Sequence, residues 1–368
     1  MTVKNILFPL LASNKGGNIL SAASICNNIN KKKYKIHILL IFNKREEKKN
    51  LLLLKNSNSY AINYLKSKYK KNSLYSKIIL FFQLICFFFS KKFDIVHTND
   101  GSLNFFFSLL NLIFKFNLII HLRNTDNSRR NYIPFAISKK IICISNFVKN
   151  INSNMFNNKK VVLYNYVDFF YKNVKLREKH KILLNKNKKK KIILYVSNIH
   201  ERKKPINFLK IIKELSKIDK NYLGLMFFQS NKIEYAKIKN YIKKYNISKN
   251  IYLFYNLPAH YWMPLIKKVN KIILLATSIN EPLGRNLIEA IFNNIFVIAN
   301  NSGGHKEIIN NKFGILTDTN KIKKISITIH KVFKNKKYFI KNKDLSSIKK
   351  KFQNKNYFKK IENIYSNI

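Results

Sequence analysis

Short apolar runs alternate with helix-like stretches through the first half of the chain. Six of these runs have the length of a buried strand: Asn5–Leu11, Lys35–Phe42, Asp94–Thr98, Leu118–Leu122, Lys140–Ser145 and Val161–Tyr164. Helix-like stretches fall between several of them, at Ile19–Ile29, Ser76–Phe89 and Ser102–Phe114. Continuous apolar strands that alternate with helices are typical of a parallel sheet covered on both faces. The first half is therefore expected to form one α/β domain.

The same pattern starts again after a polar, strongly basic stretch, Tyr171–Lys191, which resembles an interdomain linker. Further strands are expected at Ile192–Ser197, Leu223–Gln229, Ile251–Tyr255, Lys271–Ala276, Ile295–Ala299 and Gly314–Thr317. Further helices are expected at Ile206–Leu215, Glu234–Tyr245, Tyr261–Val269, Leu287–Asn293 and Ile325–Phe333. We therefore predict an α/β protein with two Rossmann-like domains, residues 1–175 and 176–345, whose parallel sheets face a central cleft. A basic amphipathic helix at 346–368 follows, for which packing back on the first domain is one option.

The length and composition of the chain agree with two folded domains. It has 368 residues, 46% of them hydrophobic, so each half can build a core. The formal net charge of +54 is typical of nucleic-acid-binding proteins, but the lysines are spread along the whole chain, and residues with similarly AT-rich codons are also abundant. We therefore expect no nucleic-acid partner. The charge still concentrates anions, such as nucleotide sugars and lipid headgroups, near the protein.

Neither the cysteines nor the apolar tracts indicate export or membrane insertion. Cys26, Cys86 and Cys143 lie in or beside apolar runs without a C-x-x-C pair, so three buried free thiols are expected. The N-terminal apolar stretch runs into a Gly-Gly turn, unlike a signal peptide. The longest apolar tract, Ile78–Phe89, is too short to span a bilayer. These features favour a cytoplasmic protein without a transmembrane helix.

Residues 277–309 carry the most informative motif. A loop after a strand delivers Glu281, and Pro282–Arg285 then turn into a helix that carries Glu289. Gly284 allows close approach of the backbone to a ligand, and the amide groups at a helix start suit a phosphate. Carboxylates accept paired hydrogen bonds from sugar hydroxyls. The segment therefore predicts a site for a phosphate-bearing sugar compound.

The same segment resembles the signature of the retaining glycosyltransferases of family 4, also called group 1, which have the GT-B fold. That family carries two glutamates in an E-x7-E spacing with a glycine after the first, matched by Glu281, Gly284 and Glu289. Its G-G-x-x-E pattern is matched by Gly303-Gly304 and Glu307. The resemblance implies that Glu281 contacts hydroxyls of the donor sugar and Glu289 the ribose. The donor-binding residues expected in this segment are Glu281, Pro282, Leu283, Gly284, Arg285 and Glu289. The alternative interpretation of this segment is a surface loop followed by a helix with an ordinary salt-bridged glutamate.

A second motif, YVSNIHERKKPINFLKII at residues 195–212, follows the first strand of the second half. The family usually has a Gly-Arg pair here and a lysine five residues later, which together neutralise the diphosphate. Lys203 takes the lysine position, whereas Ser197 and Asn198 stand where Gly and Arg are usual. Asn198, Arg202 and Lys203 are the donor-binding residues expected in this segment. Arg202 or Lys204 is the candidate for the missing cation. A solvated basic run is the alternative.

The first half supplies further candidates. Gly16 and Gly17 match a glycine pair that the family has after the first strand, where the backbone can approach a phosphate or an acceptor. A plain tight turn is the alternative. His97 and His121 end strands where family members often carry histidines facing the cleft, and the resemblance places His121 near the donor sugar. Two satisfied, partly buried histidines are the alternative, and His305 is expected at the pocket edge. The catalytic residues expected from the resemblance are His121, Lys203 and Glu281.

The resemblance implies a retaining transfer of a sugar from a nucleotide-diphosphate sugar, most simply a UDP- or GDP-sugar. No Asp-x-Asp motif and no His/Cys cluster with metal spacing is visible, so no metal or other cofactor is expected. We expect a saccharide or lipid-linked acceptor, in the synthesis of cell-envelope polysaccharide or lipopolysaccharide. A nucleotide-sugar epimerase on the same fold and a basic nucleic-acid-binding protein are the alternative functions.

The tract Leu74–Lys92 is apolar and has lysines at both flanks. One interpretation is a buried core helix. The other is a peripheral contact with an anionic membrane surface, on the inner face of the cell membrane, in which aromatic side chains enter the interface and lysines meet lipid headgroups.

Overall fold

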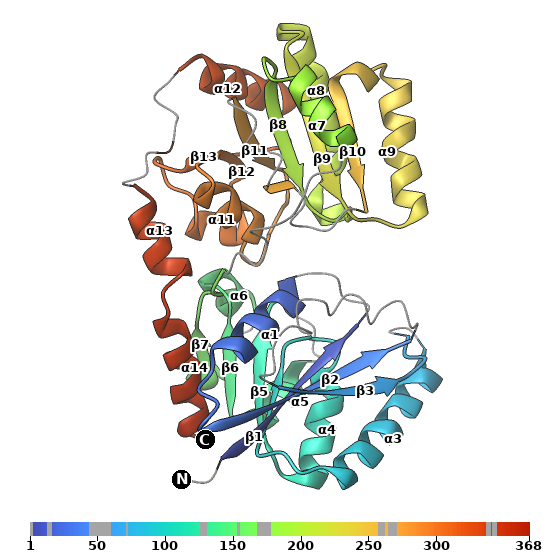
Figure 1. The fold of residues 1–368 in the computed structure, drawn as a ribbon, viewed down its shortest axis with the longest axis vertical. Coiled ribbons are helices and arrows are strands. Elements are labelled where there is room, and N and C mark those ends of the chain that lie inside the picture. The colour runs from blue at the N-terminus through green and yellow to red at the C-terminus, as the bar shows by residue number, and fades with distance from the viewer. Residues whose placement is uncertain are drawn as a thin grey trace. The chain divides into compact units, whose positions relative to one another are not determined.

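The computed structural model describes residues 3–12, 17–43, 60–70, 73–125, 131–152, 155–167, 178–256, 262–263, 271–335, 340 and 344–368. The chain divides into two compact units, one formed by residues 1–168 together with 352–368 and the other by residues 169–351. Each unit holds one parallel sheet with helices packed against it (Figure 1). The prediction of two Rossmann-like α/β domains is therefore confirmed. The boundary expected at residues 175 and 176 lies outside the described residues.

The described part of the first unit has a seven-stranded parallel sheet in the order β3-β2-β1-β4-β5-β6-β7. The strands are β1 (Lys4–Leu11), β2 (Tyr34–Phe42), β3 (Ala61–Lys66), β4 (Ile95–Thr98), β5 (Asn117–Leu122), β6 (Lys140–Cys143) and β7 (Lys160–Val162). The helices are α1 (Gly17–Asn28), α3 (Leu74–Ser90), α4 (Asn104–Phe114), α5 (Tyr132–Ile137) and α6 (Asn146–Ile151). The strand order reverses between β1 and β4, and parallel sheets bind ligands at the carboxyl ends of the strands beside such a reversal.

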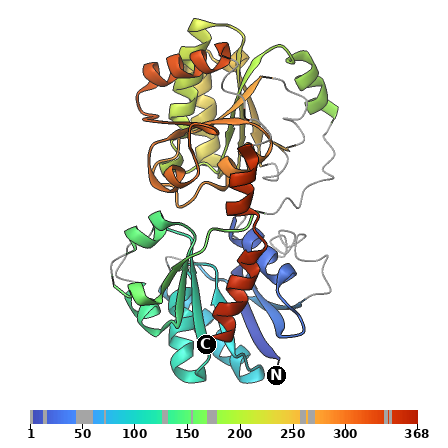
Figure 2. The ribbon, with the colours of Figure 1, turned by 90° about the vertical axis from the view of Figure 1, so that its left-hand side faces the viewer.

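The end of the chain belongs to the core of the first unit. Helix α14 (Asn356–Ser366) buries Tyr357, Phe358, Ile361 and Tyr365 among apolar side chains of α1, β1 and β2. Figure 2 shows this helix, in red, beside the strands of the first unit. The Lys4 Nζ donates to the Tyr365 carbonyl at 2.9 Å, so the first strand and the last helix are also joined by a polar contact.

The described part of the second unit has a six-stranded parallel sheet in the order β10-β9-β8-β11-β12-β13. The strands are β8 (Lys191–Val196), β9 (Tyr222–Phe228), β10 (Ile251–Tyr255), β11 (Ile272–Ala276), β12 (Phe296–Asn300) and β13 (Gly314–Thr317). The helices are α7 (Glu178–Lys186), α8 (Pro205–Ile218), α9 (Lys232–Lys244), α11 (Arg285–Phe292), α12 (Ile322–Lys334) and α13 (Leu345–Phe352), the last of which ends at the boundary of the unit. Here the strand order reverses between β8 and β11.

The expectation of a polar linker at Tyr171–Lys191 is wrong for much of its length. Residues 178–186 form the helix α7, with Glu178 in the first turn and Lys186 in the last, an arrangement that complements the helix dipole. The ring of His180 packs against Phe254 of β10, with ring centroids 5.0 Å apart. Residues 168–177 lie outside the described residues.

The single helix expected at 346–368 is also wrong, because the structure has two helices, α13 and α14, with a break between them. The Asn354 side chain accepts the amide of Asn356 at 2.9 Å. Such a local bond between a side chain and the backbone competes with the helical bonding pattern, so the helix stops and restarts here.

Within the described residues of the first unit, one strand and two α-helices were not predicted. The strand β3 alternates between exposed and half-buried residues and so has no continuous apolar run. Helices α5 and α6 have six residues each, too few to show a helical period. The helix expected at Tyr261–Val269 lies outside the described residues except for Trp262 and Met263, which are helical.

Candidate functional site

The candidate residues of the second unit gather at the carboxyl ends of β8, β11 and β12. β8 and β11 are neighbours in the sheet, with Ile192 opposite Ile272, and the strand order reverses between them. The loop after β8 carries Arg202 and Lys203, and the loop after β11 carries Glu281. Because the strands are parallel, these loops meet at one edge of the sheet although they are far apart in the sequence.

Hydrogen bonds to two main-chain carbonyls fix the loop after β8 to the loop after β11. After β8 the chain forms a short 3-10 turn, Glu201–Lys203, and then α8 begins with a proline in its first turn. The Thr277 hydroxyl donates to the Lys203 carbonyl at 2.8 Å, and the Ile279 amide donates to the Arg202 carbonyl at 2.9 Å. The two basic side chains therefore start from a backbone that is held against the loop of Glu281.

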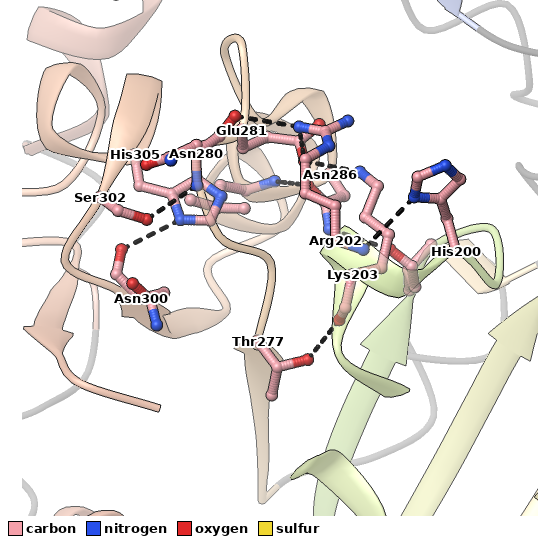
Figure 3. A network of polar contacts seen from close by, with 12 residues as sticks. His200, Arg202, Lys203, Thr277, Asn280, Glu281, Asn286, Asn300, Ser302 and His305 are labelled. Atoms are coloured by element: carbon pink, nitrogen blue, oxygen red, sulfur yellow. Dashed lines mark hydrogen bonds and ion pairs between the residues drawn. The ribbon is translucent and has the colours of Figure 1, made fainter. Parts of the chain in front are cut away.

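Glu281 forms the centre of a largely buried ion cluster (Figure 3). Its Oε2 accepts from the Lys203 Nζ at 2.6 Å and lies 3.2 Å from the Arg202 guanidinium. The side chains of Lys203 and Glu281 are only 17% and 15% exposed. Burial raises the pKa of the Glu281 carboxyl, but the charges of Lys203 and Arg202 lower it by more, so this pKa lies below its ordinary value. Glu281 is therefore ionised at neutral pH and can accept hydrogen bonds.

The glycine pair after β12 allows the Glu281 loop to lie this close. Gly303 has a φ of +62°, and a Cβ placed on it would lie 2.6 Å from the backbone N and O of Glu281. The Gly304 amide donates to the Glu281 carbonyl at 2.7 Å. On the same side the Ser302 hydroxyl accepts the amide of Asn280 at 2.9 Å. A side chain at either glycine would push this loop away, so the G-G-x-x-E pattern has a direct steric reason here.

The start of α11 lies at the same edge of the sheet. Gly284 precedes the helix with a φ of +103°, and the Asn286 side-chain amide donates to the Val196 carbonyl at the end of β8, at 2.9 Å. The helix start, with its amide groups and the positive end of its dipole, is thereby placed beside the reversal in strand order.

Glu289 lies one turn into α11 and is paired within the helix. Its Oε1 accepts from the Arg285 Nε at 2.8 Å, and its side chain is 11% exposed. Burial raises the pKa of the Glu289 carboxyl by more than Arg285 lowers it. One carboxylate oxygen of Glu289 is already bound to Arg285. The contact with a ribose implied by the resemblance therefore stays a prediction.

His305 is buried against Gly284. Its Nδ1 lies 3.1 Å from the Asn300 carbonyl, which can only accept, so Nδ1 carries the proton. Its Nε2 has no hydrogen-bond partner within the described residues. Burial lowers the pKa of the His305 imidazole despite the charge of Glu281, so the ring is neutral at pH 7.

The candidates of the first unit lie at its own reversal in strand order. His97 at the end of β4 is fully buried, its Nδ1 lies 2.6 Å from the Tyr365 hydroxyl, and its Nε2 lies 3.3 Å from the Nδ1 of His121. The His121 Nε2 in turn lies 3.4 Å from Arg123. An arginine can only donate, so the His121 Nε2 accepts from Arg123 and the His121 Nδ1 donates to the His97 Nε2. The His97 Nδ1 then donates to the Tyr365 hydroxyl. Both ring nitrogens of His121 are therefore engaged inside the protein in this conformation.

The glycine pair after β1 is only partly within the described residues. Gly16 lies outside them, and Gly17 begins α1. The Asn99 side chain after β4 donates to the Asn18 carbonyl in the first turn of α1, at 2.6 Å. The end of β4 and the start of α1 are thus fixed together.

Sequence reasoning did not find three of the residues that hold the site together, Thr277, Asn280 and Asn286. Thr277 and Asn280 lie in the loop after β11 and Asn286 in the first turn of α11, where any polar residue looks the same. Asn198, in the usual place of an arginine, is exposed, and it is Arg202 that lies beside Glu281.

Across the described ranges, no group of three or more His, Cys, Asp or Glu side chains could hold a metal ion.

Comparisons with known proteins give the family of the second unit. The family model for glycosyl transferases group 1 matches residues 177–352. No curated protein sequence matches the chain. Among solved structures, HepE from Anabaena in complex with UDP and glucose has a TM-score of 0.80 at 14% identity, covering 99% of this chain and 100% of that one.

Two further structures agree with this fold. A glycosyltransferase from Rickettsia africae has a TM-score of 0.71 at 19% identity, over 100% of this chain and 99% of that one. The lipopolysaccharide outer core galactosyltransferase WaaB has a TM-score of 0.69 at 16% identity, over 100% of both chains. Residues 177–352 thus belong to the glycosyl transferases group 1 family, and the chain that carries them is a glycosyltransferase with the two-domain GT-B fold.

Proposed function

We propose that this glycosyltransferase moves a sugar, with retention of anomeric configuration, from a UDP-sugar to a saccharide or lipid-linked acceptor in the synthesis of a cell-envelope glycan. The observation that carries the proposal is the cluster of Lys203, Arg202 and Glu281 beside the start of α11, at the reversal in strand order. This is the position at which parallel α/β sheets bind nucleotides. The solved complexes of HepE with UDP and with UDP-glucose favour uridine over guanosine in the donor.

Lys203 and Arg202 are the residues we expect to bind the diphosphate. An ammonium group has three N–H donors, so Lys203 can keep its bond to Glu281 and still donate twice to phosphate oxygens. Arg202 supplies the second cation in place of the arginine that the family usually has at position 198, because its guanidinium already lies 3.2 Å from Glu281. The amides at the start of α11 add donors without a further charge.

Glu281 is the residue we expect to hold the transferred sugar. Both cations contact its Oε2, so Oε1 can accept a sugar hydroxyl. In the transfer, the bond between the anomeric carbon and the phosphate oxygen breaks, and a bond to the acceptor oxygen forms on the same face. The acceptor proton passes to the leaving diphosphate, whose growing charge Lys203 and Arg202 stabilise.

His121 remains a proposed contact near the donor sugar. Its two nitrogens are engaged with His97 and Arg123, so contact with a ligand requires one of these bonds to be exchanged. For the acceptor, the lipopolysaccharide galactosyltransferase WaaB is one structural relative whose acceptor is an envelope glycan.

The test uses two pairs of lysine and glutamate in the same unit. Glu281→Ala and Lys203→Ala are each expected to lower turnover of a UDP-sugar at least tenfold, about 1.4 kcal/mol of transition-state stabilisation. The controls are Glu214→Ala and Lys217→Ala, which break an ion pair of similar length, 2.7 Å, on the exposed face of α8. Turnover at the wild-type rate in both site variants, with all four proteins folded, would refute the assignment.

A further inference from the structure

Helix α3 of the first unit is apolar on two opposite faces. Its buried face consists of Ser76, Leu80, Leu84 and Phe88. Its other face, which we call the outer stripe, consists of Tyr75, Ile78, Phe82, Cys86 and Phe89, all of them exposed. At 3.6 residues per turn, these five residues fall within an arc of about 80° along roughly 20 Å of helix. The outward face of a helix in a soluble protein is normally polar, so the outer stripe needs an explanation.

The outer stripe continues onto the neighbouring helix. Its aromatic ends, Tyr75 and Phe89, are both 76% exposed. The ring of Phe89 contacts Phe114 of α4, with centroids 5.2 Å apart, and the two preceding residues of α4, Leu112 and Ile113, are 62% and 52% exposed. Figure 1 shows α3 and α4 side by side. Exposed apolar patches of this extent mark interaction sites.

The surroundings of the outer stripe are cationic. The exposed lysines of this part of the unit are Lys66, Lys68, Lys70, Lys91, Lys92 and Lys115. The nearby acids are engaged with the protein, because Asp94 accepts the Asn5 amide at 2.6 Å and the buried Asp100 accepts the Ser102 hydroxyl at 2.6 Å. An apolar, aromatic strip edged by lysines matches the two layers of an anionic membrane surface, acyl chains and headgroups.

We propose that the outer stripe docks the protein on an anionic lipid surface, with α3 lying along the interface. Among the described residues, no helix is long and apolar enough to cross a membrane, so α3 would lie on the bilayer rather than span it. A second copy of the chain is a poorer partner, because a two-fold contact through this face would set the same lysines against each other. The contact with lipid does not depend on the proposed function. Only its link to a lipid-linked acceptor rests on that function.

Vesicle flotation tests the proposal. The wild-type chain is expected to float at physiological salt with vesicles of phosphatidylglycerol and phosphatidylcholine, and far less with phosphatidylcholine alone. The variant Phe82→Ser/Phe89→Ser is expected to lose at least tenfold in partitioning. The matched control is Ile233→Ser/Ile327→Ser, which removes two exposed apolar side chains of α9 and α12 in the second unit and is expected to float like wild type.

Cys86 provides a second measurement in the wild-type chain. It is the exposed cysteine, while Cys26 and Cys143 are buried, so a maleimide reacts with Cys86 first. Anionic vesicles are expected to slow this reaction severalfold. The proposal is overturned if the wild type stays at the bottom of the gradient, if the stripe variant floats equally well, or if that variant instead dissociates a dimer seen by light scattering. Melting shifts with UDP-sugars monitor the second unit separately, so failure here leaves the proposed function standing.

Discussion

Replacing Gly303 by alanine tests why the Glu281 loop has its shape. Alanine at a φ of +62° costs roughly 1–2 kcal/mol because its Cβ crowds the carbonyl oxygen. The new Cβ would also lie 2.6 Å from the backbone N and O of Glu281, and such overpacking costs about 1–3 kcal/mol. Gly303→Ala should therefore destabilise the second unit by about 2–5 kcal/mol. At roughly 2–4 °C per kcal/mol for a unit of this size, the melting temperature falls by about 4–20 °C.

The chain carries its own reporter for this measurement. Trp262 is its single tryptophan, is fully buried and belongs to the second unit, so its fluorescence follows the unfolding of that unit. The control is Gly101→Ala, where a new Cβ would meet only the Asn124 side chain, at 3.7 Å, without positive φ. The control is expected to melt like wild type. If Gly303→Ala melts within 1 °C of Gly101→Ala and binds UDP-sugar equally well, the close packing of the glycine pair on Glu281 does not shape the site.

Two further predictions concern the first unit. Burial holds the pKa of His97 at about 3, against 6.5 for a free histidine, so the stability this group contributes is complete above pH 6.5 and is lost as the pH falls below it. The loss at pH 5 is about 2 kcal/mol, and hydrogen exchange of β1 and β4 at pH 7 and 5 should show it. His97→Phe should reduce the pH dependence by this amount, while the buried His121, whose pKa burial also lowers, keeps its own contribution. Tyr365→Phe should cost about 1–2 kcal/mol, because it removes the acceptor of the buried His97 N–H. Faster exchange in α14 would reveal the loss, and unchanged exchange would contradict the bond.

Strands with continuous apolar runs were the easiest part of the fold to predict. The bounds of β10 and β13 agree with the prediction residue for residue, because Asn250 and Asn256 flank β10, and β13 begins at a glycine and ends before Asp318. Helix α7 was missed because six of its nine residues are polar, three of them lysines, and in a lysine-rich chain a basic helix and a basic linker look alike. The expectation of three buried thiols is wrong for Cys86, because α3 is apolar on both faces and composition does not show which face is covered.

The candidate site was predictable where a motif names the residue. The family resemblance pointed to Glu281, Lys203 and the glycine pair, and in the structure these residues lie together. Their roles toward a donor stay predictions. Sequence left open whether Arg202 or Lys204 supplies the second cation, because that depends on how the turn after β8 is oriented. The structure has Arg202 beside Glu281, through a bond between its carbonyl and the amide of Ile279. Such a contact depends on which strands are neighbours, which local sequence does not encode.

Calorimetric titration of UDP-glucose into wild type, Lys203→Ala and Lys217→Ala tests the anion site of the second unit most directly. Removing the half-buried Lys203 is expected to weaken binding at least tenfold, about 1.4 kcal/mol, while removing the exposed lysine of the Lys217–Glu214 pair leaves the Kd unchanged. Equal Kd values for the two variants would contradict a diphosphate site built on Lys203.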